Sequence, residues 1–283
     1  MSNIVLEEVH LESSTYCDAA CVFCPQKAVK RKGQMSYDLF MNVVDQAADL
    51  GCGNFTPFRA NEPLQFPRLF EWLLYFWYKK VNAIIFTNAN NLTDEIGDKL
   101  LGFGDIIHSL TISFHGGTPE VYRANMGLDF GQVRDNVLRF LAKSPPFPVH
   151  IFCMHRSTTV SSEQAFLDLW KEVPGLESVG IRGAMEWTGD CPDPMTTINE
   201  WKQAGRPITR VPCSRVTRQL DVTYDGDVCL CCVDAHVQVI FGNLREQTIE
   251  EIWDNRLRRW YVEQHEKCNF DIPLCKECSI NLG

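Results

Sequence analysis

Hydrophobic and polar positions in the first two hundred residues form two kinds of segment. In one kind the apolar residues recur every three or four positions, as at Leu39, Phe40, Val43 and Val44, which is typical of a helix with one buried face. In the other kind, short apolar runs such as 81–86 indicate strands of a buried parallel sheet. The pattern predicts strands over 4–11, 54–58, 81–86, 106–114, 149–154 and 179–183, and helices over 36–50, 66–80, 93–101, 118–142 with an interruption near Gly127, and 161–172.

About six strand–helix units in a row predict an α/β fold. Their strands run parallel and their helices lie outside, as a barrel or as an open sheet. The pattern changes after residue 190, where the stretch 190–212 contains four prolines and no clear period, so we interpret it as a linker. We therefore expect two domains, 1–205 and 206–283.

The second half begins with a predicted hairpin. Two alternating runs over 217–231 flank Asp225-Gly226, and Asp-Gly at such a place is a strong turn signal. A helix is predicted over 248–264, and we expect its arginines, Arg258 among them, to form a solvated face. The tail, 268–283, is irregular and rich in cysteine.

Composition narrows the possible functions. The chain has 283 residues and a net charge of −9, which disfavours non-specific binding to nucleic acid or to anionic membranes. It has no run of eighteen apolar residues and no secretory signal, so we expect a cytoplasmic protein. Its thirteen cysteines are an odd number in a long chain, which favours reduced thiols and metal ligands over a disulfide scaffold.

The first cysteine group follows the first predicted strand. Cys17, Cys21 and Cys24 are close enough in sequence to bind one face of a four-iron cluster, leaving one iron without a protein ligand. The alternative is three buried or zinc-binding cysteines. The CxxxCxxC spacing, with Phe23 before the last cysteine, resembles the radical S-adenosylmethionine (SAM) superfamily. The resemblance implies that the open iron binds SAM, and that electron transfer yields a 5′-deoxyadenosyl radical that abstracts a substrate hydrogen.

Short polar motifs after later strands resemble the SAM-binding segments of that superfamily. Asn61-Glu62-Pro63 stands where a Gly-Glu-Pro-like turn is usual, with Asn in place of Gly, and Thr87-Asn88-Ala89 resembles Thr-Asn-Gly. Each motif taken alone is equally consistent with an ordinary strand-end turn. Their order agrees with the rule that ligands bind at the carboxyl ends of parallel strands. The resemblance implies SAM contacts from Phe23, Asn61, Glu62, Thr87, Asn88, Ser113, Ile181 and Gly183.

A second cysteine group lies in the last third of the chain. Cys213, Cys231, Cys275 and Cys278, with Gly226, Gly242-Asn243 and Ile252-Trp253 between them, resemble the SPASM/twitch extension of radical SAM enzymes. The resemblance implies a partial (β/α)6 TIM-like barrel followed by a small twitch domain, a β-hairpin plus helix, which binds a second four-iron cluster. Four cysteines would also suit tetrahedral zinc. Cys229 and Cys232 leave the ligand register open, because strand alternation puts Cys229 and Cys231 on one face and Cys232 on the other.

The overall layout is similar to that of a short radical SAM dehydrogenase acting on an aminocyclitol alcohol. It implies a small hydroxylated, sugar- or aminocyclitol-like substrate and an auxiliary cluster that accepts the second electron of a net dehydrogenation. It also implies a reductant such as flavodoxin or ferredoxin, and a catalytic Arg182 that contacts substrate or helps remove the hydroxyl proton. One alternative is an epimerase or cross-linking enzyme acting on a sugar or a ribosomal peptide, with Cys153 or Cys191 near the barrel mouth. The main interpretation of each of these two cysteines is a small buried hydrophobic residue. Another is an iron–sulfur electron-transfer protein.

Overall fold

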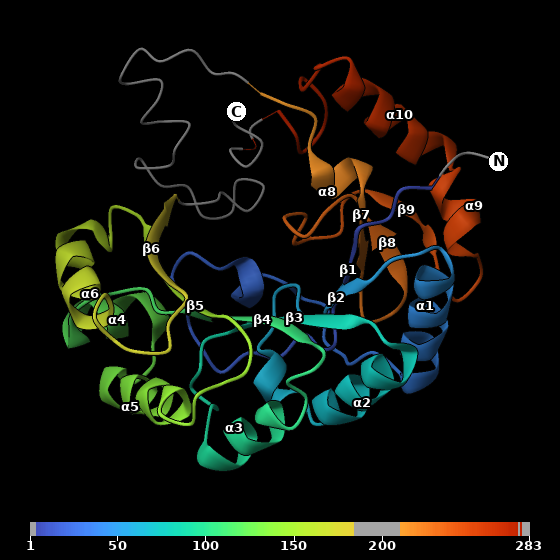
Figure 1. Cartoon of the computed structure of the whole chain (residues 1–283). Helices are drawn as coiled ribbons and strands as arrows, with labels where there is room; N and C mark the ends of the chain where they lie inside the picture. The colour runs from blue at the N-terminus through green and yellow to red at the C-terminus, as the bar shows by residue number, and fades with distance from the viewer. Residues whose placement is uncertain (1–3, 184–209, 277, 279–283) are drawn as a thin grey trace.

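The computed structural model describes residues 4–183, 210–276 and 278, and these form one curved nine-stranded sheet (Figure 1). The strand order is β6-β5-β4-β3-β2-β1-β7-β8-β9. The first six strands run parallel in chain order, as in a partial TIM barrel, which confirms the predicted fold class. They are β1 Glu8–Leu11, β2 Asn54–Thr56, β3 Asn82–Thr87, β4 Ile107–Ser113, β5 Val149–His155 and β6 Ser178–Gly183.

Helices α1 to α6 cover the outer side of this sheet (Figure 1). Polar side chains cap two of them at the N-terminus: Ser36 and Thr93 accept hydrogen bonds from the amides of Leu39 and Ile96. Gly127, with a φ of 69°, ends α4 in the left-handed conformation and confirms the predicted interruption. The helices are α1 Tyr37–Asp49, α2 Leu69–Lys79, α3 Asp94–Leu101, α4 Pro119–Met126, α5 Phe130–Leu141 and α6 Glu163–Trp170, with short 3₁₀ turns η1 Pro25–Lys27, η2 Pro63–Gln65 and η3 Val160–Ser162.

Strand alternation separates an apolar outer face from a polar inner face. On β1, Val9 and Leu11 are fully buried in the core against the helices. Glu8 and His10 alternate with them and point to the inner side. The outer core is rich in aromatic rings, such as Phe40 and Trp72, whose centroids lie 4.0 Å apart. The inner side of the sheet is therefore the face that carries the polar side chains of a possible active site.

The C-terminal part extends the same sheet. Strand β7 pairs in parallel with β1, and the β7–β8 hairpin turns at Gly226, as predicted. The expected domain boundary at residue 205 lies outside the described residues, as does most of the predicted linker. The elements are α8 Ser214–Thr217, β7 Gln219–Val222, β8 Asp227–Cys229, β9 Ile240–Asn243, α9 Ile249–Trp253 and α10 Arg256–Glu266.

Two expectations for this part were wrong. The single helix over 248–264 is two helices, because Asn255 donates to the Phe241 carbonyl (2.7 Å) and caps a new helix by accepting from the Leu257 amide (2.7 Å). Arg258 is buried rather than solvated: its guanidinium lies 3.4 Å from the centroid of the Trp253 ring and donates to the Val216 carbonyl. In the described part of the chain no helix is both long and apolar enough to span a bilayer.

Candidate active site

Cys17, Cys21 and Cys24 lie on the loop that leaves β1. Their thiols are close enough that the Cys24 and Cys17 charges act on Cys21, after burial itself, to raise its pKa. Burial likewise raises the pKa of the Cys17 thiol to about 12. Thiolates gathered in a partly buried place destabilise one another unless a cationic centre binds them. This donor set suits an iron–sulfur cluster with three protein ligands.

The cysteine loop is held against the end of the sheet by Asp18. The Asp18 carboxylate accepts hydrogen bonds from the side-chain amides of Asn88 (2.8 Å) and Asn90 (2.7 Å), which follow β3. On its other side, the Ala20 amide donates to the Met126 carbonyl (2.8 Å) at the end of α4. Two asparagines from the third strand thus position the loop of the first.

Glu62 fixes the backbone beside this loop. Its carboxylate accepts from the Thr87 hydroxyl (2.6 Å), the Leu64 amide (3.0 Å) and the Asn88 amide (2.7 Å). Burial raises its pKa to about 7, against the effect of these hydrogen bonds. Three of roughly four acceptor positions of the carboxylate are thus already used inside the protein. A ligand at this turn can therefore donate to one remaining lone pair of Glu62 and to the neighbouring backbone carbonyls.

Asn61 and Ala89 show how this chain accommodates its departures from the usual motifs. The Asn61 side chain accepts from the Arg59 amide (3.1 Å) and donates to the Ser13 hydroxyl (3.0 Å), so it shapes the turn. Ala89 has a φ of 59°, a conformation that glycine adopts at lower cost. The Thr87 hydroxyl, which accepts from the Ala89 amide (2.9 Å), stabilises that turn.

The inner faces of β4, β5 and β6 bring further expected residues together. Ser113 pairs with Phe152 in the strand register, and the Arg182 guanidinium lies 4.4 Å from the centroid of the Phe152 ring. The His115 ring lies 5.3 Å from that of Phe152 and 5.0 Å from that of Phe23. Arg182 is exposed on this face, and Gly183 follows it at the end of β6. A cation, a hydroxyl and aromatic surface therefore share one side of the sheet beside the cysteine loop.

His115 is held as a neutral imidazole. Its Nδ1 accepts from the Met154 amide (3.2 Å), so its proton lies on Nε2. Burial, together with the nearby Arg156 charge, lowers the pKa of His115 to about 3. Its remaining ring nitrogen is consequently a hydrogen-bond donor.

Ile181 and Cys153 do not share the inner face. They are partners in the β5–β6 register, and both pack in the core beside the outer helices. Only the backbone of Ile181 can therefore face a ligand on the inner side. Strand alternation turns Cys153 outward, where it is fully buried and burial raises its pKa to about 12. It is therefore the small buried residue that we mainly expect it to be, and it does not approach the barrel mouth. Cys191 lies outside the described residues.

The second cysteine group gathers around His265 on α10. The Cys213 amide donates to His265 Nδ1 (3.2 Å), and His265 Nε2 is 3.4 Å from the Cys275 Sγ. After burial, the charges of Cys278 and Cys213 are the largest causes that raise the pKa of Cys275, to about 12. Arg210 donates to the carbonyls of Cys275 (2.9 Å) and Cys278. No sequence pattern indicates the roles of His265 and Arg210, because they contact this group through a ring nitrogen and through backbone carbonyls.

The run from Cys229 to Cys232 contains three candidates for a fourth cysteine of this group. Cys229 Sγ accepts from Arg59 (3.2 Å), whereas Cys232 lies beside His10 and Asp221. Cys231 and Cys275 both contribute to raising the pKa of Tyr261, after burial, so these two thiols lie near the same hydroxyl. β8 ends at Cys229 with a register shift, so the strand alternation expected to orient Cys231 and Cys232 does not extend to them. Cys231 thus lies near Cys275, while Arg215 lies near Cys231, Cys232 and Cys213 together.

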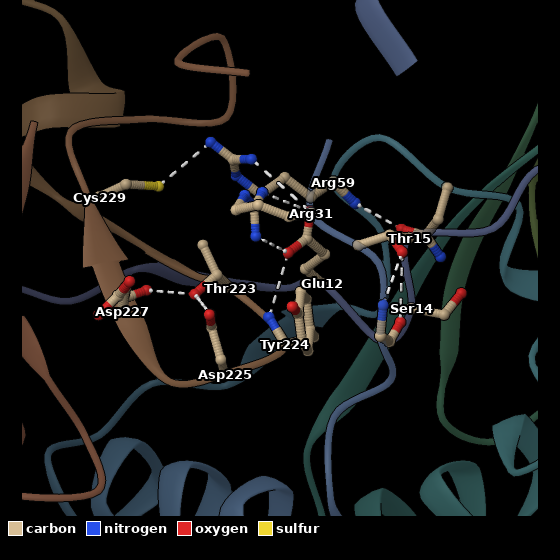
Figure 2. A network of polar contacts seen from close by, with 12 residues as sticks. Glu12, Ser14, Thr15, Arg31, Arg59, Thr223, Tyr224, Asp225, Asp227 and Cys229 are labelled. Atoms are coloured by element: carbon tan, nitrogen blue, oxygen red, sulfur yellow. Dashed lines mark hydrogen bonds and ion pairs between the residues drawn. The ribbon is translucent and has the colours of Figure 1, made fainter. Parts of the chain in front are cut away.

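Arg59 connects the two halves of the site (Figure 2). This fully buried side chain donates to Cys229 Sγ and to the carbonyls of Cys231 (3.4 Å) and Asp234. Its Nη1 lies 3.8 Å from a carboxylate oxygen of Glu12, at the end of β1. Glu12 in turn binds Arg31 through two hydrogen bonds of 3.0 and 3.1 Å. One buried guanidinium thus joins the strands beside the first cysteine loop to the loop that carries the second group.

Comparisons with known proteins agree with this geometry. The model of the radical SAM superfamily matches residues 11–160, and that of SPASM, an iron–sulfur cluster-binding domain, matches residues 213–279. An S-adenosyl-L-methionine-dependent 2-deoxy-scyllo-inosamine dehydrogenase of Niallia circulans is 22% identical over 280 residues, covering 96% of this chain and 92% of that protein.

Two solved structures show the same fold. One is BtrN in complex with AdoMet and 2-DOIA, with a TM-score of 0.65, 18% identity, and coverage of 97% of this chain and 93% of that one. The other is Streptococcus suis SuiB bound to the precursor peptide SuiA, with a TM-score of 0.74, 15% identity, and coverage of 97% and 71%. At these identities the likeness concerns the fold alone.

Proposed function

Because the chain belongs to the radical SAM superfamily and carries a SPASM domain, we propose that it dehydrogenates a small hydroxylated substrate of sugar or aminocyclitol type. Its cofactors are SAM, the four-iron cluster of the radical SAM domain and iron–sulfur ligation in the SPASM domain. The similarity over nearly the full length to an aminocyclitol dehydrogenase supports this choice of reaction. We further propose one auxiliary four-iron cluster on Cys213, Cys231, Cys275 and Cys278, and a flavodoxin or ferredoxin as reductant.

The observation that carries the proposal is the exposed Arg182 on the inner face beside the cysteine loop. When bound, SAM and its cluster supply a 5′-deoxyadenosyl radical for hydrogen abstraction, and the auxiliary cluster supplies an acceptor for the second electron. The chain must then bind the hydroxyl and stabilise the charge that grows on its oxygen. A guanidinium remains protonated at all working pH values, so Arg182 donates hydrogen bonds to that oxygen and is not itself the base. His115 Nε2–H is a second donor, and the proton leaves to solvent.

A turnover assay tests this proposal. The anaerobically reduced, cluster-loaded protein is incubated with SAM and a panel of sugars and aminocyclitols, and 5′-deoxyadenosine and carbonyl product are measured. We expect equal amounts of the two products with one substrate class. Arg182→Gln should lower kcat/KM about a hundredfold, the size of effect seen when one donor to a developing oxyanion is removed. Arg134→Gln, an exposed helix arginine paired with Asp135, is the matched control and should retain full activity.

Other outcomes point to the alternatives. Solvent deuterium in an otherwise unchanged carbon skeleton, without carbonyl product, would indicate epimerisation. Iron without any 5′-deoxyadenosine, with every substrate tried, would indicate an electron-transfer protein. Either result contradicts the dehydrogenase proposal.

A further inference from the structure

His10, Asp221 and Cys232 converge on the inner side of the sheet. His10 on β1 lies directly opposite Asp221 on β7 in the parallel register, and Cys232 follows β8. One donor atom from each residue lies within 4.8 Å of the other two. Imidazole nitrogen, carboxylate oxygen and thiolate sulfur together form a donor set that suits zinc and similar divalent cations.

Two of these donor atoms lack a hydrogen-bond partner among the described residues. Asp221 is 1% exposed, and its Oδ1 is a buried acceptor with no donor, as is the facing Nδ1 of His10. The two atoms are 3.6 Å apart, which is too long for a hydrogen bond. It is close to the separation of about 3.3 Å between two ligands at about 2.0 Å from one tetrahedral ion. A cation between them would satisfy both atoms.

The rest of the His10 ring is arranged as in a metal-binding histidine. Its Nε2 lies 2.9 Å from Glu8 Oε1, which also accepts from the Thr56 hydroxyl (2.8 Å). Metal-binding histidines usually donate their second N–H to such a carboxylate, which fixes the tautomer and the ring orientation. This contact leaves Nδ1 as the nitrogen that faces Asp221.

We propose that His10 Nδ1, Asp221 Oδ1 and Cys232 Sγ bind one divalent cation of the zinc class, separate from both iron–sulfur clusters. The fourth position of the ion is left to water, because His10 and Cys232 are partly rather than fully buried. The ion joins the first strand of the barrel to the C-terminal hairpin. It forms no part of the radical reaction, so the proposal stands independently of the substrate.

The test is metal analysis of the cluster-loaded protein. It is incubated anaerobically with Zn²⁺, freed of excess metal, and analysed for zinc and iron by mass spectrometry and at the zinc edge by X-ray absorption. We expect about one zinc per chain with a single sulfur among nitrogen and oxygen ligands. Asp221→Asn and Cys232→Ser should each weaken zinc binding at least tenfold without changing the iron content. Cys229→Ser is the matched control, because that thiol contacts Arg59 and should leave zinc binding intact.

Two results with the unaltered protein would overturn the proposal, so it does not depend on the variants folding. If no zinc is retained, the three residues are a buried salt-bridge cluster around a protonated His10. If zinc is retained but is bound by sulfur alone, it occupies the four-cysteine group instead.

Discussion

Replacing Arg59 by methionine should destabilise the protein far more than replacing an arginine on the surface. Arg59 Nη2 alone reaches three acceptors, on Cys229, Cys231 and Asp234, and Nη1 pairs with Glu12. A hydrogen bond from a charged group contributes about 1.5–3 kcal/mol, and breaking a buried ion pair costs about 3–5 kcal/mol.

Two features of the network make the expected loss of stability smaller than these contributions added together. Glu12 retains the two hydrogen bonds from Arg31, so it is not left without a cationic partner. Within the described residues, Nε and Nη1 of Arg59 have no hydrogen-bond partner, so the native guanidinium is already buried at a cost. We therefore expect Arg59→Met to lower the free energy of unfolding by about 3 kcal/mol. Arg59→Lys, which keeps the charge but loses the planar fork, should lose about 2 kcal/mol.

Anaerobic urea denaturation of the cluster-loaded protein measures these differences. Arg68→Met is the control, because Arg68 forms an exposed pair with Glu71, worth at most about 1 kcal/mol. If Arg59→Met is no more destabilising than Arg68→Met, the hydrogen bonds and the ion pair of Arg59 do not stabilise the fold.

Three further predictions concern other parts of the site. Asp18→Asn removes the charge that accepts from Asn88 and Asn90, so the cysteine loop is held about 1.4 kcal/mol less strongly and iron loss to a chelator should be about tenfold faster. An unchanged rate of iron loss would show that Asp18 does not hold the loop. His115 has its pKa lowered from 6.5 to about 3, so it binds fewer protons folded than unfolded, and its contribution to stability is lost as pH falls below 6.5. Between about pH 7.5 and 5.5 the loss is about 1.4 kcal/mol, and urea titrations of His115→Asn should lack it; an equal pH dependence in both proteins would refute the assignment. Gly117→Ala places a Cβ 2.1 Å from the Ser162 carbonyl oxygen and should lower the unfolding free energy by about 3 kcal/mol, whereas Gly180→Ala, which meets nothing within 4 Å, should be near neutral in the same measurement.

The barrel part of the fold could be predicted because its signals are local. The helix over 93–101 and the interruption near Gly127 each depend on a few neighbouring residues, and both are found as expected. The cysteine groups were also identifiable, since their spacing is itself a sequence feature. The matches to the radical SAM and SPASM family models confirm the family and the cofactors that these cysteine groups indicated.

The contacts that connect the site could not be predicted, because their partners are remote in sequence. Arg59 binds Cys229, 170 positions away, and nothing near residue 59 indicates that a guanidinium is needed there. The same holds for Asn255, whose side chain meets the Phe241 carbonyl and divides one helix pattern into two. The side of the sheet that Cys153 faces depends on the strand register as well, which turns it toward the helices and away from the barrel mouth.

The pairing of β1 with β7 has a consequence for how the chain is made. Contacts such as that between Glu7 and Arg218 join positions 211 residues apart. During synthesis β1 therefore stays without its partner β7 until most of the chain has left the ribosome. Until then one border of the nascent sheet exposes unpaired backbone amides and carbonyls, which favour association with other chains. A fragment that stops before residue 210 would keep that border permanently, and we expect it to self-associate rather than to behave as an independent barrel.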